Sequence, residues 1–150
     1  MCRRYEDEVD AVSFNGADAA SPAPGVLEAI RAAEAIVFAP SNPYVSLGPI
    51  LAVTPIREAI ARRGVRCVAV SPLIGGRSVK GPVDRMLTRM AGGTTPAHVA
   101  DCYVGLIDAL VVDAADAPAK ASVPLVVTET LMTDRVAAGR LAETVLEAAA

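Results

Sequence analysis

The sequence contains few aromatic residues, cysteines and histidines, and these shortages limit what the protein can be. With three Tyr, two Phe and no Trp, its core has to be aliphatic. Cys2, Cys67 and Cys102 are odd in number and far apart, which favours free thiols in a reducing cytoplasm over disulfides or a zinc site. The single histidine, His98, has no companion ligands in the sequence, so we expect a solvated surface residue.

Long apolar runs and clusters of basic residues are also missing. No run approaches the ~20 apolar residues that span a bilayer, and the basic start is not followed by the apolar stretch of a signal peptide. The net charge is −3, which argues against nucleic acid as the main partner. We therefore expect one cytoplasmic domain over residues 1–150, with no membrane and no nucleic acid as partner.

Short apolar runs alternate with segments of helical periodicity along the whole chain. The expected strands cover residues 9–14, 35–39, 66–71, 109–113 and 124–128. The expected helices begin near Val26, at Thr54–Pro55 with Thr54 as the N-cap, at Pro82, at Thr95–Pro96 and near Asp134. This alternation predicts an α/β fold with a mostly parallel sheet, right-handed crossovers and flanking helices.

The segment Pro40–Val53 follows the expected strand at 35–39. Its proline, glycine, asparagine and serine residues disfavour regular helix, which predicts a stiff polar loop over 41–46. A polar loop at the carboxyl end of a buried strand is where open α/β sheets bind ligands. Ser41, Asn42 and Ser46 can position a phosphate or a heterocycle, although they include no pair of nucleophile and base. The alternative is a rigid surface turn whose side chains bond to their own backbone.

A second loop carries Gly75 and Gly76 after the expected strand 66–71. The two glycines allow the backbone to approach a ligand closely, and Arg77 and Lys80 can meet an anionic group. The loop is not a Walker motif, because Gly and Pro follow Lys80 where Ser or Thr would be needed. The alternative is a simple turn.

Two carboxylates and several hydroxyls follow the last two expected strands. Asp113 and Asp116 stand at a strand end, where a carboxylate can accept hydrogen bonds, associate with a metal or cap a turn. The segment from Thr128 to Asp134 has the hydroxyl density of a strand-to-helix turn, and Thr133 or Asp134 suits the cap of the last helix.

Three stretches together resemble one protein family. They are Ser41–Val53 followed by Ile56–Ala59, Val68–Asp84, and Thr128–Asp134, with support from Pro22–Ile30. These long motifs, in this order, resemble the 2-phospho-L-lactate transferases of coenzyme F420 biosynthesis. One departure is Thr54-Pro55, which stands where the family more often has Pro-Gly.

The resemblance implies a Rossmann-like enzyme that moves a phospholactyl or phosphoenolpyruvyl group from a guanosine diphosphate donor to the deazaflavin Fo, releasing GMP with the help of Mg²⁺. It implies a homodimer and a nucleotide site at Ser41, Asn42, Pro43, Ser46, Gly75, Gly76 and Lys80. Polar support for this site is expected from Asp113, Asp116, Thr128 and Thr130.

The family's glycine-rich first turn and its magnesium carboxylates belong to an N-terminal half that this chain does not match. The resemblance therefore implies a C-terminal half that has no metal ligands of its own and a sheet that is truncated at its N-terminal side. Two alternatives stay open. One is a non-catalytic CofD-like regulatory module that binds a nucleotide, and the other is an inactive fragment that needs a partner chain.

Overall fold

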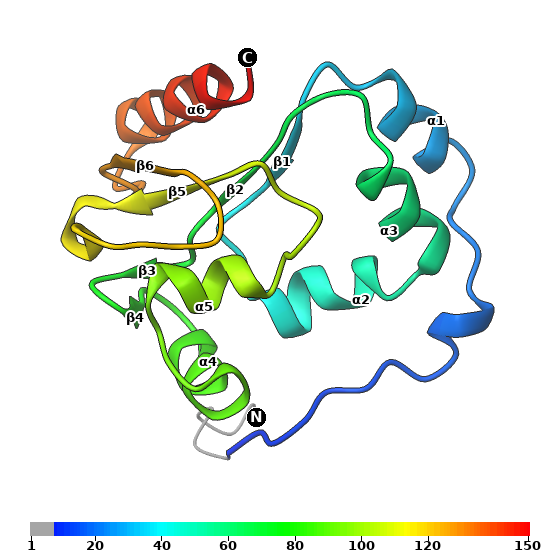
Figure 1. The fold of residues 1–150 in the computed structure, drawn as a ribbon, viewed down its shortest axis with the longest axis horizontal. Helices are drawn as coiled ribbons and strands as arrows, with labels where there is room; N and C mark the ends of the chain where they lie inside the picture. The colour runs from blue at the N-terminus through cyan, green and yellow to red at the C-terminus, as the bar shows by residue number, and fades with distance from the viewer. Residues whose placement is uncertain (1–7) are drawn as a thin grey trace.

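Four parallel strands form the central sheet of the computed structural model, which describes residues 8–150 (Figure 1). They are β1 (Ile36–Phe38), β2 (Cys67–Val70), β5 (Ala109–Asp113) and β6 (Leu125–Thr128). Their order in the sheet is β1-β2-β5-β6, with every neighbouring pair parallel. The predicted α/β fold with a parallel sheet is confirmed, and four of the five expected strands are present.

Helices cover both faces of this sheet, but unequally. Those before β6 are α1 (Val26–Ala32), α2 (Gly48–Leu51), α3 (Thr54–Ala61), α4 (Val83–Ala91) and α5 (Pro96–Asp101). The helix α6 (Arg135–Ala149) follows β6, and short 3₁₀ turns cover Ala17–Ala19 and Ala114–Asp116. In Figure 1, α6 lies on one side of the sheet and α2 to α5 lie on the other.

The two faces hold separate cores. On the larger side, Leu87, Val99 and Tyr103 pack against strand residues such as Leu110, and the Tyr103 ring meets Phe38 edge-on with centroids 5.3 Å apart. On the other side, Leu141 and Val145 of α6 and the strand residues Val68, Val70 and Val111 belong to one buried cluster. The strands β2 and β5 are buried on both faces, which explains why they are apolar throughout except for Asp113 at the end of β5.

The expected strand at residues 9–14 is wrong. The segment is irregular and pairs with no strand in the described sheet. Its alternation has another cause: Phe14 turns inward and lies against Gly48, where an added Cβ would stand 3.0 Å from the ring. Asp10 turns outward and forms an ion pair with Arg89. Alternating burial requires an inside and an outside, but it does not require a neighbouring strand.

The expected loop over 41–46 is also corrected, because the chain becomes helical almost at once. A π-helical turn covers Pro43–Leu47, and α2 continues from Gly48. The Asn42 side chain caps the turn, and Pro43 and Pro49 each stand in a first helical turn, where a proline does not break a helix. Similarly, Thr54 is the first residue of α3 and not its cap; Val53 stands at that position.

The turn at Gly75 and Gly76 joins a small hairpin that the sequence did not reveal. Strands β3 (Leu73–Ile74) and β4 (Arg77–Ser78) pair antiparallel around it. Both glycines have positive φ, 58° and 71°, as the favoured two-residue hairpin turn requires. This hairpin stands at the carboxyl end of β2, next to the loops that leave the other strands.

The expected free thiols are confirmed for Cys67 and Cys102, while Cys2 and the N-terminal residues 1–7 lie outside the described part. Burial raises the pKa of the Cys67 thiol to about 11. His98 caps its own helix: its Nδ1 lies 2.7 Å from the Thr95 hydroxyl and accepts the Thr95 N–H. Within residues 8–150, we find no helix with the length and apolarity needed to cross a bilayer.

Candidate functional site

A cavity of about 650 Å³ opens beyond the carboxyl ends of the parallel strands. Segments that follow β1, β2 and β6 line it, and we call it the strand-end cavity. Its polar lining consists of Ser41, Asn42, Ser46, Ser71, Lys80 and Thr130, and its apolar lining of Val9, Val45, Ile74, Val79, Val83, Met86, Leu131 and Met132; Pro40, Pro72, Gly81 and Pro82 complete it. This is the edge at which open parallel sheets bind their ligands.

Asn42 serves both the backbone and the cavity. Its Oδ1 accepts the N–H groups of Tyr44 at 2.9 Å and Val45 at 3.3 Å, which fixes the start of the π-helical turn. Its Nδ2 donates to the sulfur of Met86 at 3.3 Å, and a thioether is a weak acceptor. The acceptor end of the amide is therefore committed, while the donor end can turn to a ligand at little cost.

Lys80 is the one charged side chain among the described residues that line this cavity. It lies on a short turn between β4 and α4. The Ser78 hydroxyl donates to the Gly81 carbonyl at 2.7 Å, and Asp84 accepts the Ser78 N–H at 3.3 Å. Burial disfavours the charged form of Asp84, but hydrogen bonds from Ser78 and Arg85 outweigh it and hold its pKa below the ordinary value. The cavity thus carries a fixed turn with one cation, which suits an anionic ligand.

Large apolar side chains are unusually exposed around the same cavity. Val45, Val79, Leu131 and Met132 are each about half exposed or more, and all four line it. We call these four residues the apolar rim. Exposed apolar side chains that cluster around a cavity indicate a binding site, whereas apolar side chains that are exposed singly do not. The cavity therefore combines a polar, cationic part with a rim that suits a flat apolar group.

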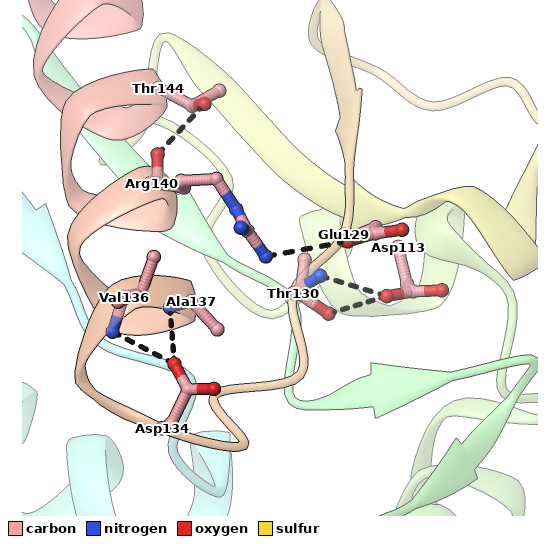
Figure 2. Close-up of polar contacts among 8 residues, drawn as sticks. All are labelled: Asp113, Glu129, Thr130, Asp134, Val136, Ala137, Arg140 and Thr144. Atoms are coloured by element: carbon pink, nitrogen blue, oxygen red, sulfur yellow. Dashed lines mark hydrogen bonds and ion pairs between the residues drawn. The ribbon is translucent and has the colours of Figure 1, made fainter.

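A buried carboxylate, Asp113, bonds to Thr130 of the cavity lining, as Figure 2 shows. Asp113 ends β5, and its Oδ2 accepts both the N–H of Thr130 at 2.9 Å and its hydroxyl at 3.0 Å. Its Oδ1 accepts the N–H of Ala115 at 2.9 Å. Burial disfavours the charged form of Asp113, but these three hydrogen bonds outweigh it and keep its pKa below the ordinary value. Asp113 thereby ties the segment that carries Leu131 and Met132 to the sheet.

The same segment ends in a well-formed helix cap. Asp134 accepts the N–H groups of Ala137 and Val136, both at 2.8 Å, as Figure 2 shows. These bonds lower the pKa of the Asp134 carboxyl. The predicted capping role of Asp134 is confirmed, and residues 129–134 are fixed at both ends.

The structure leaves several of the predicted site residues outside the cavity. The N–H groups of Gly75 and Gly76 donate to the Asp116 carboxylate at 3.1 Å and 2.8 Å, so this turn binds a carboxylate of the protein itself. Pro43, the first residue of the π-helical turn, is buried. Thr128 lines a separate shallow hollow beside Glu129 and Arg140. Of the predicted residues, Ser41, Asn42, Ser46, Lys80 and Thr130 meet at one place.

The described residues do not fit the magnesium ion that the resemblance implies. The lining of the strand-end cavity holds no carboxylate. Across residues 8–150, no group of three His, Cys, Asp or Glu side chains is arranged to hold a metal ion. We therefore derive no step through a metal from this chain.

Some residues that line the cavity cannot be identified as site residues from the sequence alone. Met86 belongs to the apolar stripe of α4, and nothing in its spacing distinguishes a residue that touches Asn42 from a core residue. Ser71 is a buried serine whose hydroxyl accepts the Leu73 N–H at 3.2 Å. The sequence does carry a signal for Leu131 and Met132. They are two large apolar residues between threonines in a strand-to-helix turn, where exposure to water is unfavourable, so their presence indicates that something covers them.

Comparison with known proteins gives a consistent result. Residues 2–140 match the family model described as 2-phospho-L-lactate transferase CofD. A protein named phosphoenolpyruvate transferase from Streptomyces coelicolor is 46% identical over 152 aligned residues, covering 93% of this chain and 48% of that protein. A protein of the same name from Streptomyces griseus is 50% identical over 117 residues, covering 77% of this chain and 37% of that protein.

An archaeal relative is more distant. A protein named 2-phospho-L-lactate transferase from Methanothermobacter thermautotrophicus is 34% identical over 131 residues, covering 87% of this chain and 41% of that protein. In each of these comparisons, this chain spans less than half the length of the curated relative that it matches.

Proposed function

This chain belongs to the CofD family of 2-phospho-L-lactate transferases, and from that membership we propose that its strand-end cavity holds the donor diphosphate and the acceptor Fo in a transferase of coenzyme F420 biosynthesis. The reaction joins the ribityl hydroxyl oxygen of Fo to the distal phosphorus of a guanosine diphosphate donor. The bond from that phosphorus to GMP breaks, GMP leaves and the hydroxyl proton is released. The transferred group is phospholactyl or phosphoenolpyruvyl.

The observation that carries this proposal is the convergence of Ser41, Asn42, Ser46 and Lys80 on one cavity at the strand ends. Attack at a phosphorus needs positioning and charge neutralisation more than a covalent nucleophile. The Lys80 ammonium supplies positive charge for the diphosphate, and the two hydroxyls and the Asn42 amide supply directional donors. Mg²⁺ would neutralise more of the charge when bound, but its ligands are not found among the described residues.

The apolar rim supports a second part of the proposal. The donor is strongly polar, but the Fo ring system is flat and largely apolar on its faces. Val45, Val79, Leu131 and Met132 offer such a ring an aliphatic surface beside the cation. A bound ring that covers these side chains would gain about 25 cal/mol of binding free energy for each Å² of apolar area that it buries. We therefore assign the ring to the rim and the diphosphate to the Lys80 side.

One observation favours a non-catalytic alternative for the isolated chain. Its cavity has groups that bind but, within residues 8–150, no carboxylate beside them to take up the hydroxyl proton. A regulatory module of the same family that only binds a nucleotide would also have groups that bind and no carboxylate that accepts the proton.

An assay of GMP release separates these two functions. The chain is incubated with donor, Mg²⁺ and Fo, alone and together with the half of the Streptomyces coelicolor relative that it does not match. We expect Fo-dependent GMP release from the pair only. A chain that binds GDP but supports no release in either sample would favour the regulatory module.

The role of Asn42 is tested by Asn42→Asp, which keeps the capping acceptor and removes the amide donor. We expect this variant to unfold at the same urea concentration as the wild type and to bind GDP at least about tenfold more weakly. It loses the amide donor, and an unmade buried hydrogen bond costs about 1–3 kcal/mol; it also places a negative charge beside the anionic ligand. Titration calorimetry with GDP gives the affinities. Asn42→Ala is the comparison, because it should lose the cap as well, at about 1 kcal/mol of stability. Unchanged GDP affinity in both variants would contradict the assignment.

A further inference from the structure

The order of the strands places β1 at one open edge of the described sheet. From β1 through β2 and β5 to β6, each successive strand is added on the same side. In doubly wound sheets the ligand lies where this direction reverses, at the switch point between two halves. Here the polar residues Ser41 and Asn42 follow β1, which is the first strand of the series. A reversal next to these residues requires another strand on the open side of β1.

The backbone of β1 is ready for such a strand. The Ile36 N–H donates to the Arg66 carbonyl at 3.0 Å, which is on the β2 side. Because alternate residues of a strand turn their backbone groups to opposite sides, the N–H and C=O of Val37 face the open side. In the described sheet β1 has one neighbour, β2. An edge of this kind is a template for pairing with another chain segment.

The face of the sheet beside this edge is also uncovered. Val37 is level with Val68 in the sheet, so both side chains project to the α6 face. Val68 is fully buried under α6, whereas Val37 is 44% exposed. Parallel sheets are normally covered on both faces, so an exposed strand valine here lacks a helix.

Right-handed crossovers explain which helix is missing. The helices between β1, β2 and β5 all lie on the face opposite α6 (Figure 1). Strands added in the reverse direction place their crossover helices on the other face, which is the face that Val37 exposes. The relatives supply a source, because more than half of their length lies outside the part that this chain matches.

We propose that the open edge of β1 and the adjoining surface at Val37 bind a parallel strand with an apolar crossover helix, both from the family half that this chain does not match. The strand pairs with the backbone of Val37, and the helix covers its side chain. The proposal concerns assembly alone and stands whether or not the cavity carries out the proposed transfer.

The test co-expresses this chain with the unmatched half of the Streptomyces coelicolor relative and measures complex formation by sedimentation. Val37→Lys places a charge on the proposed surface, and Val37→Thr is a milder change that keeps the β-branched shape. Val127→Lys is the matched control, since Val127 is a valine of the opposite edge strand and is 51% exposed. Circular dichroism checks that each variant folds.

We expect a one-to-one complex for the wild type and Val127→Lys, at least tenfold weaker association for Val37→Lys and an intermediate loss for Val37→Thr. Equal association of all variants, loss with Val127→Lys alone, or no complex with the wild type would overturn the proposal. Self-association of the chain that Val37→Lys abolishes and the added half does not compete with would assign the edge to a second copy instead.

Discussion

Asp113→Ala is expected to lower the free energy of unfolding by about 3 kcal/mol, because it removes the acceptor of three hydrogen bonds at once. The Thr130 N–H and hydroxyl are buried and would be left without a partner. The substitution also frees the segment that carries Leu131 and Met132 into the cavity, so GDP binding should weaken together with stability. Urea unfolding at pH 7 measures the first effect.

Two variants provide the controls. Asp113→Asn keeps one oxygen acceptor but replaces the other oxygen by an amide group, so it can serve Ala115 or Thr130 but not both, and we expect roughly half the loss. Asp18→Ala changes an exposed aspartate for which no hydrogen bond is found among the described residues, and it should leave stability within about 0.5 kcal/mol. If Asp113→Ala were as stable as Asp18→Ala, the hydrogen bonds between Asp113 and Thr130 would contribute nothing to the free energy of unfolding.

The pH dependence has a definite sign. The pKa of Asp113 is lower in the folded protein than its ordinary value of about 3.9. Its contribution to stability is therefore fully present above that ordinary value and is lost as the pH falls through the folded pKa. The difference in unfolding free energy between the wild type and Asp113→Asn should be constant near neutrality and shrink below about pH 4.

Lys80→Met is expected to weaken GDP binding roughly 10- to 100-fold, since a charge-assisted hydrogen bond is worth about 1.5–3 kcal/mol. The side chain is exposed at the mouth of the cavity, so the loss should be largest at low salt and decrease as salt screens the charge. In the pair of halves that releases GMP, the same substitution should lower the rate. Titration of GDP at two salt concentrations gives the binding effect.

The sequence offers a matched control for Lys80, because its one other lysine, Lys120, lines a different hollow beside Asp116. Lys120→Met should bind GDP as the wild type does. Lys80→Arg keeps the charge with a different shape and should retain part of the affinity. If the Met and Arg variants of Lys80 bound alike, the charge would be irrelevant to the ligand.

The strands that are buried on both faces were predictable from their sequences, because a short apolar run that ends in turn residues is typical of a buried parallel strand. Cys67–Val70 and residues 109–112 are unbroken apolar segments of strand length, followed by polar or turn residues. Residues 9–14 alternate between apolar and polar positions, yet Phe14 faces Gly48 in a helical segment and Val9 lines the strand-end cavity, so neither faces a second strand. Sequence alternation indicates which residues face inward, and it does not identify the partner.

The helical stretch from Pro43 is not predictable from composition, because prolines within a segment ordinarily indicate a break in a helix. Pro43 and Pro49 each open a helical turn, where the missing N–H has no partner to lose. The capping oxygen of Asn42 makes the first turn possible, and its contribution depends on a backbone geometry that composition does not specify. The general position of the cavity was predictable, since it depends only on strand ends meeting at one edge.

Some of the predicted site residues lie in the cavity and others do not, and the difference depends on contacts that are distant in sequence. Ser41, Asn42, Ser46 and Lys80 were predicted from polar loops, and the fold brings these loops together. Gly75 and Gly76 were predicted as ligand contacts, but their N–H groups bind Asp116, which is about 40 residues further along the chain. Such a long-range bond needs the tertiary structure. The binding roles of all the predicted site residues stay predictions, those inside the cavity as well as those outside it.

Among residues 8–150, α6 alone covers one face of the sheet, and this has a consequence for how the molecule opens. Leu141, Val145 and Ala149 are buried in one cluster with β2 and β5 residues, so lifting any one of them uncovers the others. The α6 amides should therefore exchange their hydrogens with solvent in one concerted event and not residue by residue. The β2 amides remain protected by the opposite core during that event, and the two sets would report two distinct opening free energies within one fold.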